Sequence, residues 1–205
     1  MLPVGGQSPI NTNTPPVNSS TAQSDTQPVT RTDTFTQIGN SIGNAAAGGA
    51  ASFKYSSTFS NSLKSTITSV KTTEGGVGDK FKAGLPGVKS MGMTTLKAGG
   101  IGAIISGAVS AITNGIDVLQ GKKTGSEAVG TFAADTANGT IGAMAGVAAG
   151  GITTMLLGTA LGGGPLIAVG VGVGALAAVI SEKLFKGSGA YDGIRNAVIG
   201  TTSQK

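Results

Sequence analysis

A stretch of 46 residues without a charged side chain, at positions 136–181, constrains the fold of this chain more than any other feature. Small residues recur within it at every fourth position, and these are Gly142, Gly146, Gly150, Gly170, Gly174 and Ala178. A four-residue interval places side chains along one face of a helix. The stretch is about twice the roughly 20 residues that a helix needs to cross a bilayer. It therefore predicts two helices that pack through their small residues.

A break near the middle of this stretch divides it into two helices. The expected hairpin turn consists of Gly162, Gly163, Gly164 and Pro165. Proline suits the first position of a helix, where its missing N–H costs no hydrogen bond. We predict one helix over about residues 127–161 and a second over about 165–186, joined as a helical hairpin.

A second uncharged segment, the 19 residues 98–116, predicts one additional, marginal span. Small residues again recur at every fourth position, namely Gly99, Ala103, Gly107, Ala111 and Gly115. A glycine inside a helix costs about 1 kcal/mol relative to alanine. Close approach of a neighbouring helix offsets this cost, as in the packing of membrane helices through small residues. Gly121 predicts the end of this helix, and Thr124 or Ser126 with Glu127 predicts the start of the next.

The flanks of the uncharged region carry the residue types that anchor helices at a membrane surface. The expected interface anchors are Phe132, Phe185, Lys122, Lys123, Lys183 and Lys186. Polar side chains on the first hairpin helix form a candidate lumen face, and these are Asn138, Thr140, Thr153 and Thr154. Such a face would line an aqueous path if several copies associated.

The remaining chain divides by composition. Residues 1–50 form an expected disordered tail, since 25 of the first 40 residues are Ser, Thr, Asn, Gln or Pro. Residues 51–97 hold a predicted basic amphipathic helix over 52–70 and a Gly/Pro-punctuated loop over 73–93. The small-residue hydrophobic domain covers 98–186, and a polar C-terminal tail covers 187–205. The predicted fold class is all-α.

The amino-acid composition argues against catalysis. The chain contains no His and no Cys, which removes the usual nucleophile systems and the usual zinc, haem and iron–sulfur ligands. We expect no catalytic, cofactor-binding or metal-binding residue and no enzyme activity. The net charge of +5 comes mainly from single lysines in 54–97, and only two Arg occur. This pattern argues against nucleic acid as a partner.

Two other folds remain open for the uncharged region. A Gly/Ala-rich run also suits the buried core of a soluble helical assembly. The alternation of Val and Gly over 169–174 has the period of a strand. The four-residue spacing in three separate segments favours helices over strands. Insertion into a membrane is the leading interpretation, and a soluble helical assembly is the main alternative.

With these residues in view, segment 94–186 resembles the glycine-zipper hydrophobic-hairpin proteins. This broad class includes bacterial membrane-active effectors, pore-forming toxins and phage internal proteins that enter the host envelope. The resemblance rests on Gly142, Gly146, Gly150, Gly170 and Gly174. It implies that helices associate, and it implies that an amphipathic helix such as 52–70 sheathes the hairpin before insertion.

Three functions follow as hypotheses. The first is a secreted or injected protein that self-associates in a lipid bilayer and permeabilises it. The second is a structural or ejected component of a phage particle or secretion apparatus, bound through residues 1–50. The third is a resident inner-membrane protein. The N-terminus lacks a basic segment followed by an apolar run, so no Sec-type signal peptide is expected.

Overall fold

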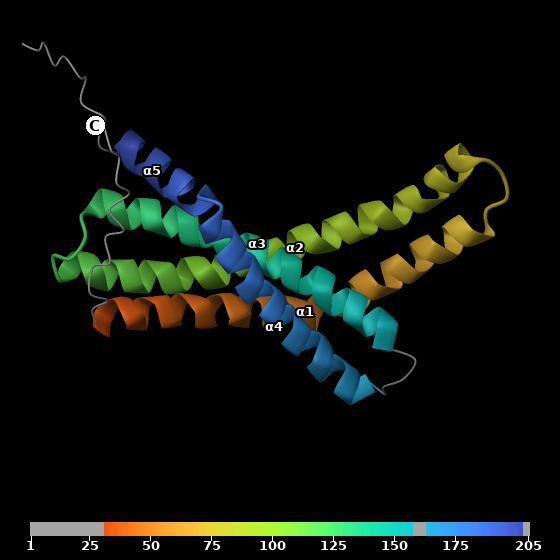
Figure 1. Ribbon diagram of the computed structural model, residues 1–205, viewed down its shortest axis with the longest axis horizontal. Helices are drawn as coiled ribbons and strands as arrows, with labels where there is room; N and C mark the ends of the chain where they lie inside the picture. Colours follow the sequence, from red (N-terminus) through yellow and green to blue (C-terminus); the bar gives the residue numbers. More distant parts are fainter. Residues whose placement is uncertain (1–30, 158–162, 203–205) are drawn as a thin grey trace, which may run out of the picture.

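The computed structural model describes residues 31–157 and 163–202, and all five of its elements are helices (Figure 1). The helices are α1 (Arg31–Thr72), α2 (Val77–Leu119), α3 (Gly125–Leu157), α4 (Gly163–Gly187) and α5 (Ala190–Thr202). No strand occurs within the described residues, and the Val/Gly alternation lies inside α4. The all-α prediction is confirmed, as is the helical hairpin.

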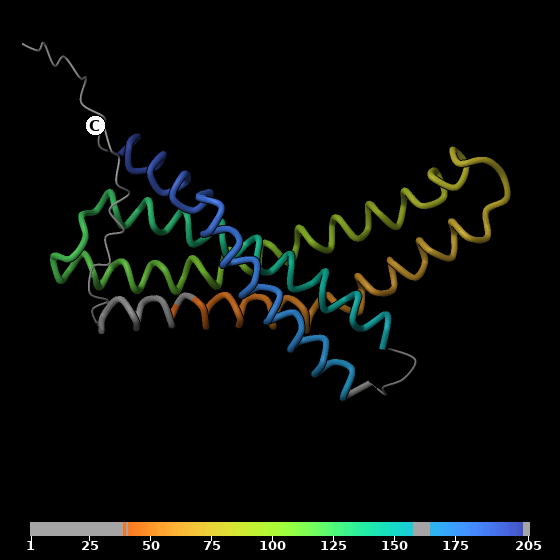
Figure 2. The backbone as a smooth tube through the Cα atoms, in the orientation of Figure 1, coloured from red at the N-terminus to blue at the C-terminus, as the bar shows by residue number. Residues whose placement is uncertain are grey.

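Helices α1 to α4 run antiparallel in succession, and α5 continues in roughly the direction of α4, as the backbone trace shows (Figure 2). Gly75 and Gly121 take left-handed backbone angles in the turns after α1 and α2, with φ of +123° and +66°. Glycine tolerates these angles because it has no Cβ. The predicted start of α3 is confirmed, since the Thr124 N–H donates to the Glu127 carboxylate at 2.8 Å.

The core between the helices is built from small side chains. Its fully buried apolar residues are Ala47, Ala51, Ala98, Ala134, Ala143, Val147 and Ala178, joined by the nearly buried Phe59. Side chains of this size let helix backbones approach closely, which is the packing that the glycine spacing predicts.

The loop expected over 73–93 is much shorter. Residues 73–76 alone separate α1 from α2, and Pro86 lies inside α2. Proline removes the hydrogen bond to the carbonyl group of Lys82. Lys82 and Pro86 are both exposed, so water can satisfy this carbonyl. Gly84 and Gly87, which suggested a loop, pack against Val70 and Thr66 of α1 instead.

Both expected tails are partly helical. Helix α1 begins at Arg31, so residues 31–50 of the predicted tail are helical, while residues 1–30 lie outside the described residues. Gly43, Asn44 and Ala47 are buried, and these contacts explain the helix. The C-terminal segment 187–205 contains α5, which packs on α3 where the Arg195 carbonyl and Ile199 meet Gly130.

The α1–α2 hairpin is longer than the rest of the bundle. Its far end, with the turn at 73–76, extends away from α3 and α4 (Figure 1). Helix α4 crosses the other helices and leads into α5 at the opposite end. The molecule therefore consists of a bundle and a projecting two-helix arm.

Candidate functional site: small-residue seams and a polar core

Helices α3 and α4 meet along the predicted glycine faces. A methyl group added at Gly146 would lie 2.9 Å from the Gly174 carbonyl oxygen, and one at Gly150 would lie 2.7 Å from that of Gly170. One turn further on, a methyl group at Gly142 would lie 3.5 Å from the Ala178 Cβ. The structure thus brings these six predicted packing residues together as three antiparallel pairs.

Helix α1 covers the same seam, which the sequence reasoning did not foresee. A methyl group at Gly146 would lie 3.0 Å from the Gly48 Cα atom. The buried Ser52 hydroxyl donates to the Gly146 carbonyl oxygen at 2.7 Å. The four-residue spacing of Asn44, Gly48 and Ser52 was the available signal for this contact. The glycine faces of α3 and α4 are therefore occupied within one chain.

On α2 the buried line of residues lies one position before the predicted one. It comprises Ala98, Gly102, Ser106, Ser110 and Asn114. Of the predicted residues, Gly99 and Gly107 are buried against α3, and Ala103 is half-buried. Ala111 and Gly115 are exposed. Polar residues face the interior here, and large aliphatic residues face outward.

The outward faces of the bundle are apolar. Ile104 on α2 is 73% exposed and Leu176 on α4 is 64% exposed. Other large exposed side chains on these helices and on α3 are Ile112, Ile116, Ile152, Leu156, Ile167, Ile180 and Leu184. In the part of the chain that the structure describes, three helices (α2, α3, and α4 from Pro165) are long and apolar enough to cross a membrane. An apolar exterior of this kind indicates association with a membrane.

A chain of polar side chains crosses the interior between α2, α3 and α5. The Ser110 hydroxyl donates to one carboxylate oxygen of Asp135 at 2.6 Å, and the Tyr191 hydroxyl donates to the other at 2.7 Å. The Asn114 amide donates to the Ser110 hydroxyl at 2.7 Å. At the α2–α3 turn, the Lys123 ammonium donates to the side-chain Oδ1 atom of Asn114 at 2.8 Å. The buried Asp135 carboxylate is thus linked to the molecular surface.

Lys123 is the last residue in this row of hydrogen-bonded side chains, and it lies beside a second carboxylate. Its ammonium lies 2.9 Å from the Asp117 carboxylate. The ion pair offsets the cost of placing Asp117, which is nearly buried, at the end of an apolar helix.

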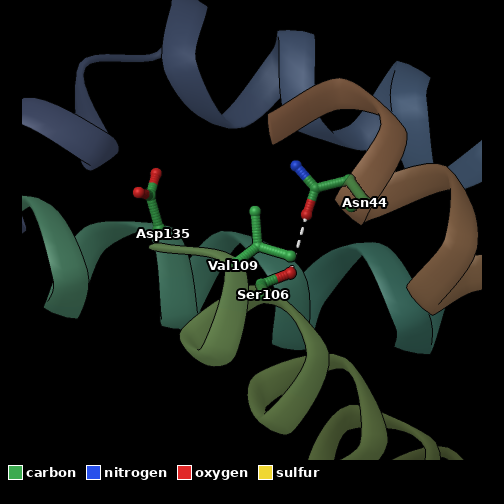
Figure 3. Close-up of a pocket in the computed structure, with 5 residues that line it drawn as sticks. Asn44, Ser106, Val109 and Asp135 are labelled. Atoms are coloured by element: carbon green, nitrogen blue, oxygen red, sulfur yellow. Dashed lines mark hydrogen bonds between the residues drawn. The ribbon is translucent and has the colours of Figure 1, made fainter. Parts of the chain in front are cut away.

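A small cavity adjoins the polar chain, with α1 as its third wall (Figure 3). Gly43, Asn44, Ser106, Val109 and Asp135 line it, and its volume of about 10 Å³ suits about one water molecule. The Ser106 hydroxyl donates to the side-chain Oδ1 atom of Asn44 at 3.0 Å across this space. The cavity places polar groups of α1, α2 and α3 around a common point.

A second pair of polar residues continues the α3–α4 seam. Four residues beyond Gly142 and Ala178 stand Asn138 and Glu182, which are 2% and 4% exposed. The Glu182 carboxylate accepts from the Lys186 ammonium at 2.6 Å through Oε1. Among the residues that the structure describes, its Oε2 atom and the Asn138 Oδ1 atom are buried without a hydrogen-bond partner. Two acceptors therefore stand without a donor at the polar end of a glycine seam.

The predicted lumen residues do not form one face. Asn138 lies in the α3–α4 seam, whereas Thr140 is half-buried beside Gly99 of α2. The hydroxyl groups of Thr140, Thr153 and Thr154 each donate to the carbonyl group four residues earlier in α3. These threonines thus satisfy their own hydroxyls locally, as serine and threonine do inside apolar helices.

The predicted anchors separate into two groups. Phe132, Lys122 and Lys183 are exposed. Lys123 and Lys186 bind carboxylates, and Phe185 lies edge-on to the Tyr191 ring, with ring centroids 6.4 Å apart. Of the predicted turn, Gly162 lies outside the described residues, and Gly163, Gly164 and Pro165 form the first turn of α4.

The environment of Tyr191 changes its acidity. Burial raises the pKa of Tyr191 well above the ordinary value of 10.0, and the neighbouring Asp135 carboxylate raises it further. A phenol that stays neutral continues to donate to Asp135, so this hydrogen bond holds α5 against α3.

Comparison with known proteins finds no similar protein. The chain matches no protein-family model, no curated protein and no solved structure.

Proposed function

We propose that this chain inserts into a lipid bilayer through the α3–α4 hairpin. One observation carries the proposal, namely the reversal of the usual distribution of side chains. Bulky aliphatic residues such as Leu176 and Leu156 are exposed, whereas Asp135, Asn138 and Glu182 are buried. Lipid offers an apolar surround to the exposed residues, and the helices satisfy their own backbone polar groups.

We further propose that the inserted chain permeabilises the bilayer as a secreted or injected effector. The buried carboxylates of Asp135 and Glu182 support this step. Ionisable groups within membrane helices are costly and commonly line the path of ions or protons. Self-association through the glycine faces requires α1 to leave the seam, because Gly48 and Ser52 occupy it.

Flotation of the purified full-length chain with liposomes tests insertion. We expect the chain to rise with vesicles and to stay with them in alkaline carbonate. The double variant Leu176→Gln/Ile180→Gln makes the exposed face of α4 polar and should float several-fold less. Lys183→Arg, on the same helix, keeps the charge of the predicted anchor, serves as the control and should float like the wild type. Recovery of the wild-type chain at the bottom of the gradient would overturn the proposal.

Potassium efflux from loaded vesicles tests permeabilisation separately. We expect efflux with the wild-type chain and a lower rate for the Leu176→Gln/Ile180→Gln variant. A chain that inserts stably and releases no potassium at micromolar concentration would contradict the effector function. That result would leave insertion intact and favour a structural component of a phage particle or secretion apparatus.

A further inference from the structure

The projecting arm, defined as residues 54–97 of α1 and α2, carries most of the positive charge of the chain. It contains seven lysines and only two acidic residues, Glu74 and Asp79. All seven lysines are exposed: Lys54, Lys64, Lys71, Lys80, Lys82, Lys89 and Lys97. Within residues 31–157 and 163–202, none of them forms an ion pair. The arm is therefore a cationic surface whose charge the described chain leaves uncompensated.

An apolar stripe runs along α2 beside these lysines. It consists of Val77, Phe81, Leu85, Val88 and Leu96, whose spacing follows one face of a helix. All five side chains are exposed. The opposite face of this segment packs on α1, where the Ser62 and Ser90 hydroxyl oxygens lie 2.8 Å apart. The arm thus presents an unpartnered apolar stripe flanked by cations.

A groove of about 400 Å³ opens on the arm between α1 and α2. Its lining residues are Thr58, Pro86, Lys89, Ser90, Met93, Thr94 and Lys97. Lys89 and Lys97 supply two ammonium groups, and Thr58 supplies a hydroxyl group. Pro86 and Met93 supply apolar surface next to them. A phosphate group attached to an acyl chain matches this combination of cations and apolar surface.

We propose that the arm docks on an anionic lipid bilayer and that the groove takes the phosphate group of an anionic lipid between Lys89 and Lys97. The apolar stripe enters the interface between headgroups and acyl chains, as in helices that lie in the membrane plane. A nucleic acid would meet the lysines but leave Phe81, Leu85 and Val88 exposed to water. The arm also contains no Arg for bidentate phosphate contacts. This inference rests on the membrane function proposed above.

Flotation of the full-length chain with neutral and anionic vesicles tests the docking surface. The neutral vesicles are phosphatidylcholine, and the anionic vesicles add 30 mol% phosphatidylglycerol. A lysine near an anionic surface contributes about 1 kcal/mol through its charge alone, or roughly 30-fold for two lysines. Lys89→Gln/Lys97→Gln also removes the contacts to the phosphate group, so it should lose more than this in affinity for anionic vesicles. The matched pair Lys64→Gln/Lys71→Gln removes the same charge outside the groove and should lose less. Glycerol phosphate added to 10 mM should not displace the wild-type chain.

The outcomes separate this inference from insertion itself. Equal losses for the two lysine pairs would overturn the groove as a lipid site, and equal flotation with neutral and anionic vesicles would overturn the docking surface. The second result would leave insertion standing, whereas flotation with neither vesicle contradicts insertion. Displacement by glycerol phosphate, or a change in oligomeric mass in place of vesicle affinity, also overturns the proposal. All four lysines are exposed, so unchanged helix content by circular dichroism verifies folding.

Discussion

At the scale of single residues, glycine is used in this chain as a contact surface. Gly146 meets backbone atoms of two other helices, whereas Gly172, on the outside of α4, has no neighbour within 4 Å of an added methyl group. The two residues have the same chemistry and belong to similar uncharged sequence. Comparing substitutions at these two positions therefore separates the effect of packing from the intrinsic cost of glycine in a helix.

Replacing Gly146 or Gly172 by alanine should change the free energy of unfolding in opposite directions. Gly146→Ala places a methyl group 2.9 Å from the Gly174 carbonyl oxygen, and we expect it to reduce the free energy of unfolding by about 1–3 kcal/mol. Gly172→Ala meets open space and should increase it by up to about 1 kcal/mol, since alanine favours the helix. Denaturant unfolding in mild detergent measures both. Stabilisation by Gly146→Ala would contradict the α3–α4 seam.

Tyr191 gives a prediction for alkaline pH. In Tyr55→Phe it is the only tyrosine, so absorbance at 295 nm reports its ionisation alone. Its pKa in the folded chain is raised above the ordinary 10.0 by burial and by Asp135. The neutral phenol therefore contributes its full stabilisation below pH 10, and this stabilisation is lost as the pH rises further. We expect no absorbance step near pH 10 until the chain unfolds.

Asp135→Asn in the same Tyr55→Phe background is the matched control. It removes the carboxylate charge and keeps an acceptor for the Tyr191 hydroxyl. The ionisation of Tyr191 should then begin at lower pH than in Tyr55→Phe. An unchanged titration would contradict the contact between α3 and α5.

The buried face of α2, which carries polar residues, could not be predicted from the spacing of small residues alone. On α2, small residues recur every four positions both from Gly99 and from Ala98. Side-chain size alone therefore does not show which of the two lines of residues is buried. The buried line carries Ser106, Ser110 and Asn114, whose partners come from α1, α3 and the α2–α3 turn. Only the positions of those partners decide which line faces inward.

At the scale of elements, the hairpin of α3 and α4 was predictable and the arm was not. The hairpin follows from an uncharged run with a break, and both features are local. In the arm, Gly84, Pro86 and Gly87 indicate a loop when taken alone. Gly84 and Gly87 are helical and contact Val70 and Thr66 of α1, which lie outside their local sequence. Tertiary packing here overrides local propensity.

Pro86 provides a test at this scale. Proline inside a helix costs up to about 3 kcal/mol relative to alanine, so Pro86→Ala should strengthen α2. Pro86 is exposed, and the substitution removes no buried contact. We expect slower amide hydrogen exchange at residues 82–90, measured by mass spectrometry, with exchange in α4 unchanged. Faster or unchanged exchange in 82–90 would contradict a continuous α2.

At the scale of the whole molecule, the uncharged segments of α2 and α3 are out of register. Gly107, the centre of segment 98–116, meets Thr136, where the uncharged part of α3 begins. The centre of that part is near Gly146, about 15 Å further along the helix axis. A bilayer centred on Gly146 would also take in Lys54, since Gly48 of α1 contacts Gly146. We therefore expect α1 and α2 to shift relative to the hairpin when it spans a bilayer.

A disulfide lock tests this shift, because the chain has no native cysteine. In Gly107→Cys/Thr136→Cys the new Cβ of residue 107 lies 3.2 Å from the position of the Thr136 hydroxyl, a separation that suits a bridge between α2 and α3. We expect potassium efflux to stop in the oxidised variant and to return on reduction. Ser62→Cys/Ser90→Cys ties α1 to α2 alone and should leave efflux unchanged. Full efflux from the oxidised α2–α3 variant would show that no shift is needed.

Lipid contact at Leu176 shows whether the exposed apolar face of α4 enters the bilayer. A bimane fluorophore on Leu176→Cys in the full-length chain reports its surroundings when vesicles are added. We expect a blue-shifted emission that brominated acyl chains quench and aqueous iodide does not. A bimane on Lys183→Cys, an exposed polar position of the same helix, serves as the comparison and should remain accessible to iodide. Quenching of the Leu176 probe by iodide, with no effect of brominated lipid, would contradict insertion of this face.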